Sequence, residues 1–183
     1  MMTLPFRTEV LLAAQDVRIA FFDVDGVLTD GGVYFSAQGE TLKRFNILDG
    51  LGLKLLRAAD IVPAVITGRD SEPLRLRLTA LGIEHVCYGV ADKLPAARQM
   101  LAALGLDWPQ AAAIGDDWPD LPVLTRAALA VAPPNAHAEV RAVAHYVTQA
   151  RGGEGAAREF CDLLLTARGR YRALLDAAKG PDA

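Results

Sequence analysis

The stretch IAFFDVDGVLTDG, residues 19–31, decides the fold of this chain. Its four apolar residues stop at acids and glycine, which is typical of a buried strand in a parallel sheet. Because open α/β sheets bind ligands at the carboxyl ends of such strands, we expect Asp23 and Asp25 to lie in a site. Gly26 lets the chain coil at this point, so Asp25 can offer its backbone carbonyl to a ligand that Asp23 shares.

Length and composition limit what the chain can be. Its 183 residues, 52% of them hydrophobic, suffice for one domain, residues 1–183, with a sizeable core. A net charge of -3 with scattered Lys and Arg residues argues against nucleic-acid binding. No apolar run approaches the roughly 20 residues that cross a membrane, so no membrane partner is expected. Cys87 and Cys161 lack metal or redox spacing, and we expect reduced thiols in a cytoplasmic protein.

Strands and helices alternate along most of the sequence, which predicts an α/β fold. Right-handed connections then give a three-layer, Rossmann-like parallel sheet with helices on both faces. The expected strands are residues 19–22, 61–66, 85–88, 111–114, 129–131 and 146–148, and the expected helices are residues 51–56, 72–81, 94–104, 121–125, 136–142 and 156–166.

Three segments lie outside this alternation. Residues 1–17 form an N-terminal extension, whose short helix at residues 9–15 is expected to lie outside the core. Residues 31–46 predict a β-hairpin flap beside the site, inserted after the first strand, with strands 33–36 and 41–45 around a glycine-containing turn. Residues 151–183 form a C-terminal helical tail, joined through a glycine-rich link that we expect to be flexible.

Polar residues gather at four predicted strand ends or helix starts, which share one edge of a parallel sheet. They are Asp23 with Asp25, Thr67 with Gly68, Lys93, and Asp116 with Asp117 and Asp120. Converging carboxylates repel one another and need a hard cation, and Mg²⁺ suits carboxylate, carbonyl and water oxygens. Asp23, the carbonyl of Asp25 and Asp116 are the expected metal ligands. A divalent ion with a lysine and a hydroxyl group is what phosphoryl chemistry requires.

The chemistry assigns a role to each of these residues. Asp23 would attack phosphorus and form an aspartyl phosphate, and Asp25 would act as acid and then as base. Crowding by neighbouring carboxylates is expected to favour the protonated form of Asp25. Thr67 would hold phosphoryl oxygens, and Lys93 would offset the negative charge. Asp117 and Asp120 would either bind the metal through water or hold Lys93 and the loop in place.

Each motif also has a purely structural interpretation when it stands alone. Asp-x-Asp-Gly is usually a turn or a helix cap, and Thr67-Gly68 could simply end a strand. Lys93 could be a solvated helix start, and residues 115–117 a loop with capping acids. All four in this order, each at an element boundary, favour the phosphoryl site.

These residues resemble the haloacid dehalogenase superfamily of phosphatases over roughly residues 18–150. The four motifs are DVDGVLTDG at residues 23–31, ITGR at residues 66–69, Lys93, and GDDWPDL at residues 115–121. The short spacing between them resembles the capless type, so the resemblance implies a fold of that superfamily without a large cap domain.

Longer stretches resemble one family within that superfamily, the 3-deoxy-D-manno-octulosonate 8-phosphate (Kdo 8-phosphate) phosphatases, which release Kdo for lipopolysaccharide synthesis. They are GVLTDGGVYFS, FNILDGLG, ITGRDS and the tail GGEGAARE. The resemblance implies a homotetramer whose hairpins pack together and whose neighbouring subunits close each site. It implies Mg²⁺ on Asp23, Asp25 and Asp116, and substrate contacts from Asp25, Asn46, Ile47, Leu48, Asp49, Gly50, Lys54, Thr67, Gly68, Arg69, Arg77 and Lys93. Glu154 departs from the family, which often has a basic residue there.

Several residues keep two interpretations. Arg69 and Arg77 suit recognition of a sugar-acid phosphate, although arginine is also common on solvated helices. Tyr34, Phe35 and Phe45 of the hairpin either form an interface between subunits or fold back onto their own domain. Trp118 either lines the site mouth or covers apolar surface. The three histidines, His85, His137 and His145, lack metal-ligand spacing and are expected to be structural.

Two alternative functions remain open from the sequence. A phosphatase for the nine-carbon 2-keto-3-deoxynononate 9-phosphate would carry nearly the same motifs. A non-enzymatic phospho-signalling receiver also gathers aspartates, a threonine and a lysine at one sheet edge, but the order of those residues here argues against it. A scaffold with an inactive site is a further alternative, although every expected chemical group is present.

Overall fold

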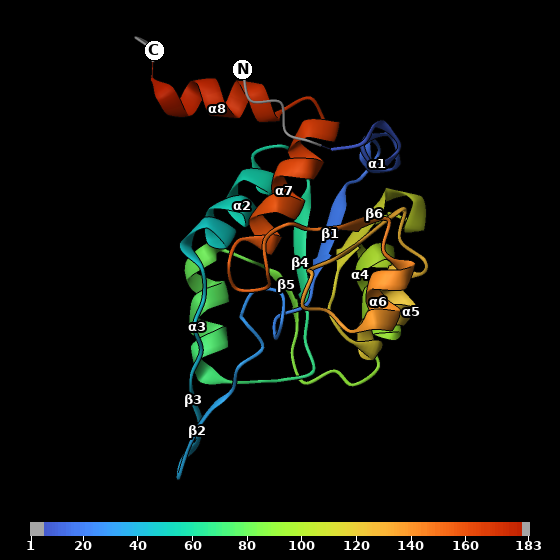
Figure 1. The fold of residues 1–183 in the computed structure, drawn as a ribbon. Coiled ribbons are helices and arrows are strands. Elements are labelled where there is room, and N and C mark those ends of the chain that lie inside the picture. Colours follow the sequence, from blue (N-terminus) through green and yellow to red (C-terminus); the bar gives the residue numbers. More distant parts are fainter. Residues whose placement is uncertain (1–5, 181–183) are drawn as a thin grey trace.

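The computed structural model describes residues 6–180, which contain a six-stranded sheet in the order β5-β4-β1-β6-β7-β8 (Figure 1). Every neighbouring pair in this sheet is parallel, which confirms the predicted sheet. The strands are β1 (Ile19–Phe22), β4 (Val62–Ile66), β5 (His85–Cys87), β6 (Ala111–Ile114), β7 (Leu129–Ala132) and β8 (Tyr146–Val147).

Alternating side chains of β1 enter two separate cores, one on each face of the sheet. Ala20 and Phe22 pack into the first core, and Ile19 and Phe21 into the second. Helices α1 (Thr8–Ala14), α2 (Ile47–Arg57), α3 (Glu72–Leu81) and α7 (Ala156–Ala167) supply the first core, and α4 (Lys93–Leu104), α5 (Leu121–Leu124) and α6 (Ala138–Val143) supply the second. This arrangement confirms the three-layer fold, and no large cap domain is present among residues 6–180 (Figure 1).

The register of β1 explains why the predicted polar clusters meet. Phe22, the last residue of β1, pairs with Val65 of β4 on one side and with Ile114 of β6 on the other. The residues that follow these strands therefore leave the same edge of the sheet side by side. The first of them after β1 is Asp23, whose backbone N–H donates to the carbonyl of Ile114 over 3.1 Å.

The N-terminal helix α1 belongs to the core, so the expectation that residues 9–15 lie outside it is wrong. Val10 and Ala14 are 3% and 0% exposed and pack in the first core beside α7. Phe6 adds an edge-to-face contact with the ring of Tyr146 at 5.6 Å. Burial of one apolar face therefore docks α1, while residues 1–5 of the predicted extension lie outside the described residues.

The predicted hairpin is present, with β2 (Tyr34–Ser36) paired antiparallel to β3 (Gly39–Leu42). Its second strand was predicted two residues too late, because the turn is confined to Ala37 and Gln38. The hairpin projects from the body (Figure 1), and Tyr34, Phe35 and Leu42 are 48%, 71% and 65% exposed. Tyr34 and Phe35 thus do not fold back onto the domain, whereas Phe45 does and packs against the first core.

The glycine-rich segment 151–155 was expected to be a flexible link, and this expectation is wrong. Gly153 donates its backbone N–H to the carbonyl of Val27 over 2.9 Å, and Gly152 donates to Oδ1 of Asn135 over 2.8 Å. A Cβ atom on Gly152 would lie 1.7 Å from the carbonyl oxygen of Gly26. The glycines therefore allow the backbone of the tail to press against the loop that follows β1.

Helix α8 (Tyr171–Lys179) follows α7 and extends away from the body at the end opposite the hairpin (Figure 1). Its charged side chains pair along the helix, Arg172 with Asp176 at 2.8 Å. No helix within residues 6–180 has both the length and the apolar character needed to cross a bilayer.

Replacing Gly152 by alanine is expected to destabilise the protein by about 2 kcal/mol, because the new Cβ must displace the backbone of Gly26. The unfolding midpoint should then fall by roughly 4–8 °C in a thermal melt. Gly32→Ala is the control: its Cβ would approach only the carboxylate of Asp30, and we expect a change within about 0.5 kcal/mol. Equal midpoints for the two variants would contradict the close packing of the tail.

Candidate active site

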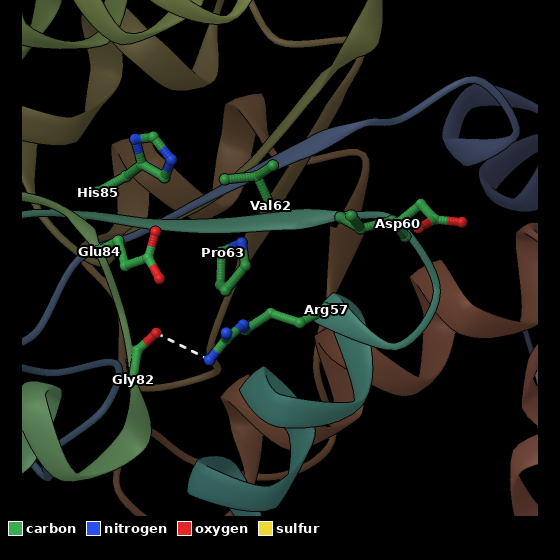
Figure 2. Close-up of a pocket in the computed structure, with 8 residues that line it drawn as sticks. Arg57, Asp60, Val62, Pro63, Gly82, Glu84 and His85 are labelled. Atoms are coloured by element: carbon green, nitrogen blue, oxygen red, sulfur yellow. Dashed lines mark hydrogen bonds between the residues drawn. The ribbon is translucent and has the colours of Figure 1, made fainter.

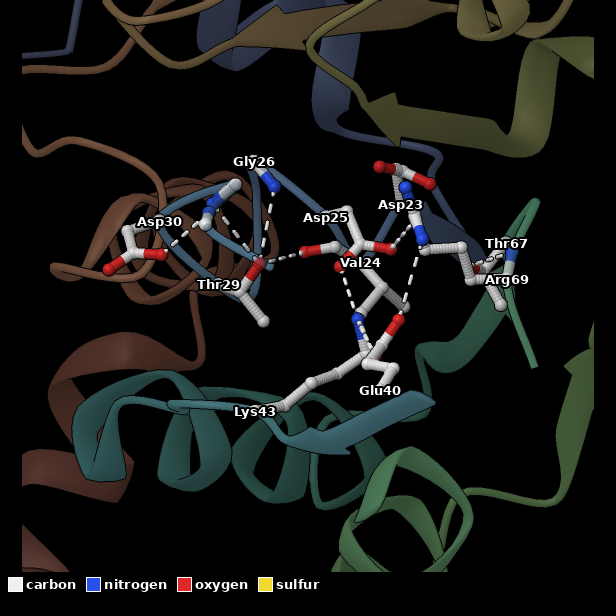
Figure 3. Close-up of polar contacts among 12 residues, drawn as sticks. Asp23, Val24, Asp25, Gly26, Thr29, Asp30, Glu40, Lys43, Thr67 and Arg69 are labelled. Carbon is white, nitrogen blue, oxygen red and sulfur yellow. Dashed lines mark hydrogen bonds and ion pairs between the residues drawn. The ribbon is translucent and has the colours of Figure 1, made fainter. Parts of the chain in front are cut away.

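The loop after β1 is held in shape by a buried threonine and a glycine. The hydroxyl of Thr29 accepts hydrogen bonds from the backbone N–H groups of Gly26 and Gly31, each at 3.3 Å (Figure 3). Gly26 has φ +92°, and a Cβ atom there would lie 2.0 Å from Oδ2 of Asp116. The loop therefore needs glycine at this position, both for its backbone and for the approach of the Asp116 carboxylate.

Three carboxylates meet at this edge of the sheet. Asp23, Asp116 and Asp120 each place an oxygen within 4.8 Å of the others. Burial, followed by the charges of Asp23 and Asp120, raises the pKa of Asp116 well above its ordinary value. Burial and the charge of Asp120 also raise the pKa of Asp23, against the opposing effect of Lys93. This mutual repulsion is what a bound divalent cation relieves, so the donor set fits Mg²⁺.

Asp120 holds the site together by accepting hydrogen bonds from three groups. Its Oδ1 accepts from the ammonium of Lys93 at 2.6 Å, and its Oδ2 accepts from the backbone N–H groups of Asp116 and Asp117 at 3.0 and 3.2 Å. Asp117 is exposed and accepts from the backbone N–H of Trp118 at 2.8 Å. Of the two roles predicted for this pair, anchoring the lysine and the loop matches the contacts of Asp120.

Lys93 is the first residue of α4, whose N-cap Asp92 accepts from the N–H of Leu94. The Lys93 ammonium lies between the carboxylates of Asp23 and Asp120, and the side chain is 6% exposed. Burial opposes its charge, but the two aspartates raise the pKa of Lys93 above its ordinary value. The lysine therefore stays charged beside Asp23, as the sequence predicted.

Thr67 follows β4 and is buried, with hydrogen bonds to its neighbours. Its backbone N–H donates to the carbonyl of Cys87 at 3.0 Å, and its hydroxyl accepts from the N–H of Arg69 at 3.2 Å. Gly68 between them is exposed, and a Cβ there would meet only the carbonyl of Val90, at 3.8 Å. The Thr67 side chain is thus presented in one orientation next to Asp23.

Asp25 is surrounded by cations, so the expectation that neighbouring carboxylates crowd it is wrong. Its Oδ1 lies 2.5 Å from the ammonium of Lys43, and its Oδ2 lies 3.7 Å from Nε of Arg69 (Figure 3). Lys43 and its second partner Glu40 come from the hairpin, and sequence reasoning missed both. The available signal was a pair of opposite charges, three residues apart, on a hairpin predicted to flank the site.

Residues 46–50, predicted to contact substrate, start helix α2 instead of preceding it. Oδ1 of Asn46 caps the helix by accepting from the N–H of Leu48 at 2.8 Å, and its Nδ2 donates to the carbonyl of Gly153 at 3.4 Å. Ile47 and Leu48 are 81% and 55% exposed. Asn46 therefore ties the tail to α2, while the next two side chains point to solvent.

Asp49 caps a neighbouring helix, which argues against its predicted contact with substrate. It is 2% exposed, and its Oδ1 accepts from the backbone N–H of Arg158 in the first turn of α7 at 2.7 Å. Oδ2 has no hydrogen-bond partner among the described residues. Burial raises the pKa of Asp49 to about 6, although the N–H of Arg158 opposes the shift.

Lys54 and Arg77 do not lie with the aspartates at the sheet edge. Together with Ile47 and Gly50 they line a shallow cavity of about 180 Å³ that includes none of the aspartates. Nη2 of Arg77 donates to the carbonyl of Asn46 at 3.3 Å, and Gly50 leaves room for it, since a Cβ there would lie 2.4 Å away. The structure thus does not bring these two predicted substrate residues to Asp23.

Two of the three histidines, His137 and His145, make hydrogen bonds that hold neighbouring segments together, as predicted for structural histidines. Nδ1 of His145 accepts from the N–H of Ala130 at 2.9 Å, and Nδ1 of His137 accepts from Nε1 of Trp118 at 3.0 Å. Trp118 itself is 59% exposed next to the Asp116 loop, so it does not cover apolar surface.

A second cavity, of about 380 Å³, opens at the opposite edge of the sheet (Figure 2). It is lined by the start of β4 with Arg57, Glu84 and His85, and Arg57 closes one side by donating to the carbonyl of Gly82 at 2.9 Å. It lacks the convergent carboxylates and the lysine of the first site. The chemistry therefore assigns the active site to the smaller space around Asp23.

Comparisons with known proteins agree with this assignment. The model of a family described as haloacid dehalogenase-like hydrolase matches residues 53–160. The 3-deoxy-D-manno-octulosonate 8-phosphate phosphatase KdsC of Yersinia pestis is 45% identical over 164 residues, 90% of this chain and 88% of that protein. The crystal structure of the Yersinia pestis phosphatase has a TM-score of 0.89 at 44% identity, covering 92% of this chain and 91% of that chain. The crystal structure of the Moraxella catarrhalis phosphatase in complex with magnesium, phosphate and KDO has a TM-score of 0.91 at 37% identity, covering 94% and 99% of the two chains.

The buried carboxylate of Asp49 is expected to make stability depend on pH. Its pKa rises from 3.8 in the unfolded chain to about 6 in the fold, so the folded state binds the proton more tightly. Its stabilising contribution is therefore complete below about pH 4 and is lost as the pH rises through about 6. Relative to Asp49→Asn, which keeps the acceptor for Arg158, the wild type should lose on the order of 2 kcal/mol between pH 4 and pH 7.

Urea unfolding of both proteins at each pH measures this difference, because other titrating groups contribute equally to the two. A difference in the free energy of unfolding that does not change with pH would show that Asp49 is not a buried, desolvated acid.

Proposed function

The chain belongs to the haloacid dehalogenase-like hydrolase family, and on that premise we propose that it is a Mg²⁺-dependent phosphatase that hydrolyses Kdo 8-phosphate to Kdo and phosphate. The observation that carries this proposal is the meeting of Asp23, Asp116 and Lys93 at one sheet edge. Such a site combines a nucleophile, a metal-binding carboxylate and a fixed cation. These are the groups that transfer of a phosphoryl group to a carboxylate requires.

We infer that Asp23, Asp116 and the carbonyl of Asp25 hold the Mg²⁺ ion, which when bound screens the charge of the phosphoryl group. Asp23 attacks phosphorus, the bond from phosphorus to the sugar oxygen breaks, and Asp25 gives that oxygen a proton. Water then attacks the phosphorus of the aspartyl phosphate, and Asp25 takes up its proton. The bond to the Asp23 oxygen breaks, which releases phosphate and restores the aspartate.

The other residues of the site stabilise charge and orient the phosphoryl group. Lys93 stays charged and lies against Asp23, so it offsets the negative charge that gathers there during attack. The hydroxyl of Thr67 and the backbone N–H of Gly68 are proposed to hold phosphoryl oxygens. Arg69 is exposed beside Asp25 and is proposed to bind the anionic substrate.

We further propose a homotetramer in which hairpins pack together and a neighbouring subunit completes each site. This is supported by large exposed apolar side chains on the hairpin and on the adjacent faces of α2 and α3: Tyr34, Phe35, Leu42, Ile47, Leu48, Leu51 and Leu76. Lys54 and Arg77 lie on this side, away from the aspartates of their own chain. The proposal therefore gives them a role in substrate binding to a neighbour's site.

A cytoplasmic location is also proposed. Both cysteines are free thiols, Cys161 buried and Cys87 partly buried, which suits a reducing compartment. Membership of a hydrolase family argues against the receiver-like and inactive-scaffold alternatives. The nine-carbon sugar-acid phosphate remains the alternative substrate.

Replacing Asp23 by asparagine is expected to lower the rate of phosphate release from Kdo 8-phosphate by at least about 10³-fold, because the amide cannot form the aspartyl phosphate. Chelation of Mg²⁺ should stop the wild-type reaction, and added Mg²⁺ should restore it. Asp176→Asn, an exposed change on α8, is the control and should leave the rate unchanged.

Release of phosphate that persists in Asp23→Asn would contradict the mechanism. Faster hydrolysis of 2-keto-3-deoxynononate 9-phosphate than of Kdo 8-phosphate, at equal concentrations, would overturn the choice of substrate but keep the reaction.

Replacing Phe35 by aspartate is expected to dissociate the tetramer, because a charge would enter the proposed hairpin interface. Size-exclusion chromatography with light scattering measures the mass directly. Leu12→Asp is a matched control, since Leu12 is also exposed, at 64%, but lies on α1 away from the hairpin. A wild-type monomer at micromolar concentration would rule out the tetramer.

A further inference from the structure

Lys43 is a buried charge on an otherwise exposed hairpin. It follows Leu42, the last residue of β3, which is 65% exposed, yet the Lys43 side chain is only 1% exposed. Its ammonium lies 2.5 Å from Oδ1 of Asp25 and 2.7 Å from Oε1 of Glu40 (Figure 3). Burying an ammonium group is costly unless it is paired, so these two contacts explain why the lysine turns inward.

Asp25 is one of four charges of alternating sign that form a closed ring. Lys43 lies between Asp25 and Glu40, and Arg69 completes the ring, with Nη1 3.5 Å from Oε2 of Glu40 and Nε 3.7 Å from Oδ2 of Asp25 (Figure 3). Although burial works against its charge, Lys43 and Arg69 lower the pKa of Glu40. Glu40 therefore stays ionised and holds both cations toward the site.

The two oxygens of Asp25 are held from two different parts of the fold, the loop after β4 and the hairpin. Oδ2 is held loosely by Arg69, which follows β4 and is 47% exposed. Oδ1 is held closely by Lys43, which comes from the hairpin. A carboxylate on the rim of a loop can rotate about its side-chain bonds, so the closer and better buried of the two cations decides its orientation.

We propose that Lys43 is a positioning residue, which holds the Asp25 carboxylate in the orientation needed to accept a proton from the water that hydrolyses the aspartyl phosphate. The inference rests on the proposed function and concerns its second step, in which Asp25 acts as an ionised base. It also makes the second step depend on the hairpin, since Lys43 and Glu40 reach the site only when the hairpin lies against it.

The test is a rapid-mixing assay of Lys43→Met with saturating Mg²⁺, using p-nitrophenyl phosphate and Kdo 8-phosphate. A base in the wrong orientation slows hydrolysis of the phosphorylated enzyme, so kcat should fall about 10–100-fold, within the range that general base catalysis contributes. Formation of the phosphorylated enzyme from p-nitrophenyl phosphate should change much less, because p-nitrophenolate leaves without a proton from Asp25, so kcat/KM for this ester is retained within about threefold. p-Nitrophenol should then appear as a burst approaching one equivalent per site, followed by slow steady release.

Two further variants separate positioning from folding. Lys179→Met removes an exposed lysine on α8 and should behave as wild type. The double variant Lys43→Met with Glu40→Gln removes both hairpin charges, so no unpaired carboxylate is left buried on the hairpin. If Lys43→Met alone fails to fold, the double variant should still show the burst.

Each remaining outcome overturns a stated part of the argument. Loss of kcat/KM in parallel with kcat and without a burst, or unchanged kinetics, would overturn the role of Lys43. Wild-type turnover of the aryl ester without turnover of Kdo 8-phosphate would overturn only the substrate, because the burst can still be measured. A wild-type protein that hydrolyses neither ester would overturn the proposed function together with this inference.

Discussion

The repulsion among three carboxylates at one sheet edge is the constraint on which the rest of the structure depends. The parallel register brings Asp23, Asp116 and Asp120 within 4.8 Å, and the fold tolerates them because Lys93 is buried between two of them. Asp120 in turn is saturated with donors from the lysine and from the Asp116 loop. Among the described residues, Asp116 is the member of the three that forms no ion pair with a lysine or arginine, and it is therefore where a cation is most needed.

Opposite charges also hold Asp25, in a ring of two cations and two anions. Here, however, Lys43 and Glu40 come from the hairpin. Lys93 belongs to a helix docked in the second core, so its position is as rigid as the sheet. Lys43 belongs to a hairpin whose outer side chains Tyr34, Phe35 and Leu42 are exposed, so its position depends largely on the ion pairs themselves. The proposed nucleophile Asp23 is thus held by the scaffold, and the proposed acid–base residue Asp25 by the hairpin.

The sequence was sufficient to predict the parallel sheet, both helical layers and the meeting of Asp23, Thr67, Lys93 and Asp116, because these depend on apolar periodicity and on where strands end. It misplaced features that depend on contacts between distant segments. Asp49-Gly50 looked like a break before a helix. In the structure α2 begins at Ile47 after its N-cap Asn46, and Gly50 lies inside the helix, where its missing side chain leaves room for Arg77. Likewise Arg151–Gly155 has the composition of a flexible linker, and only the tertiary structure shows what its glycines contact. For Lys43 and Glu40 the sequence offers only a pair of opposite charges three residues apart on the predicted hairpin, which does not show that they turn toward Asp25.

The close approach of Gly152 to Gly26 couples the C-terminal tail to the loop that follows β1. Because the carbonyl of Gly26 lies where any side chain at residue 152 would have to go, neither segment can drift in sequence independently. The loop after β1 and the segment 151–155, more than 120 residues apart, are therefore expected to change together. A relative with a different course of its tail would also need a different loop after Asp23.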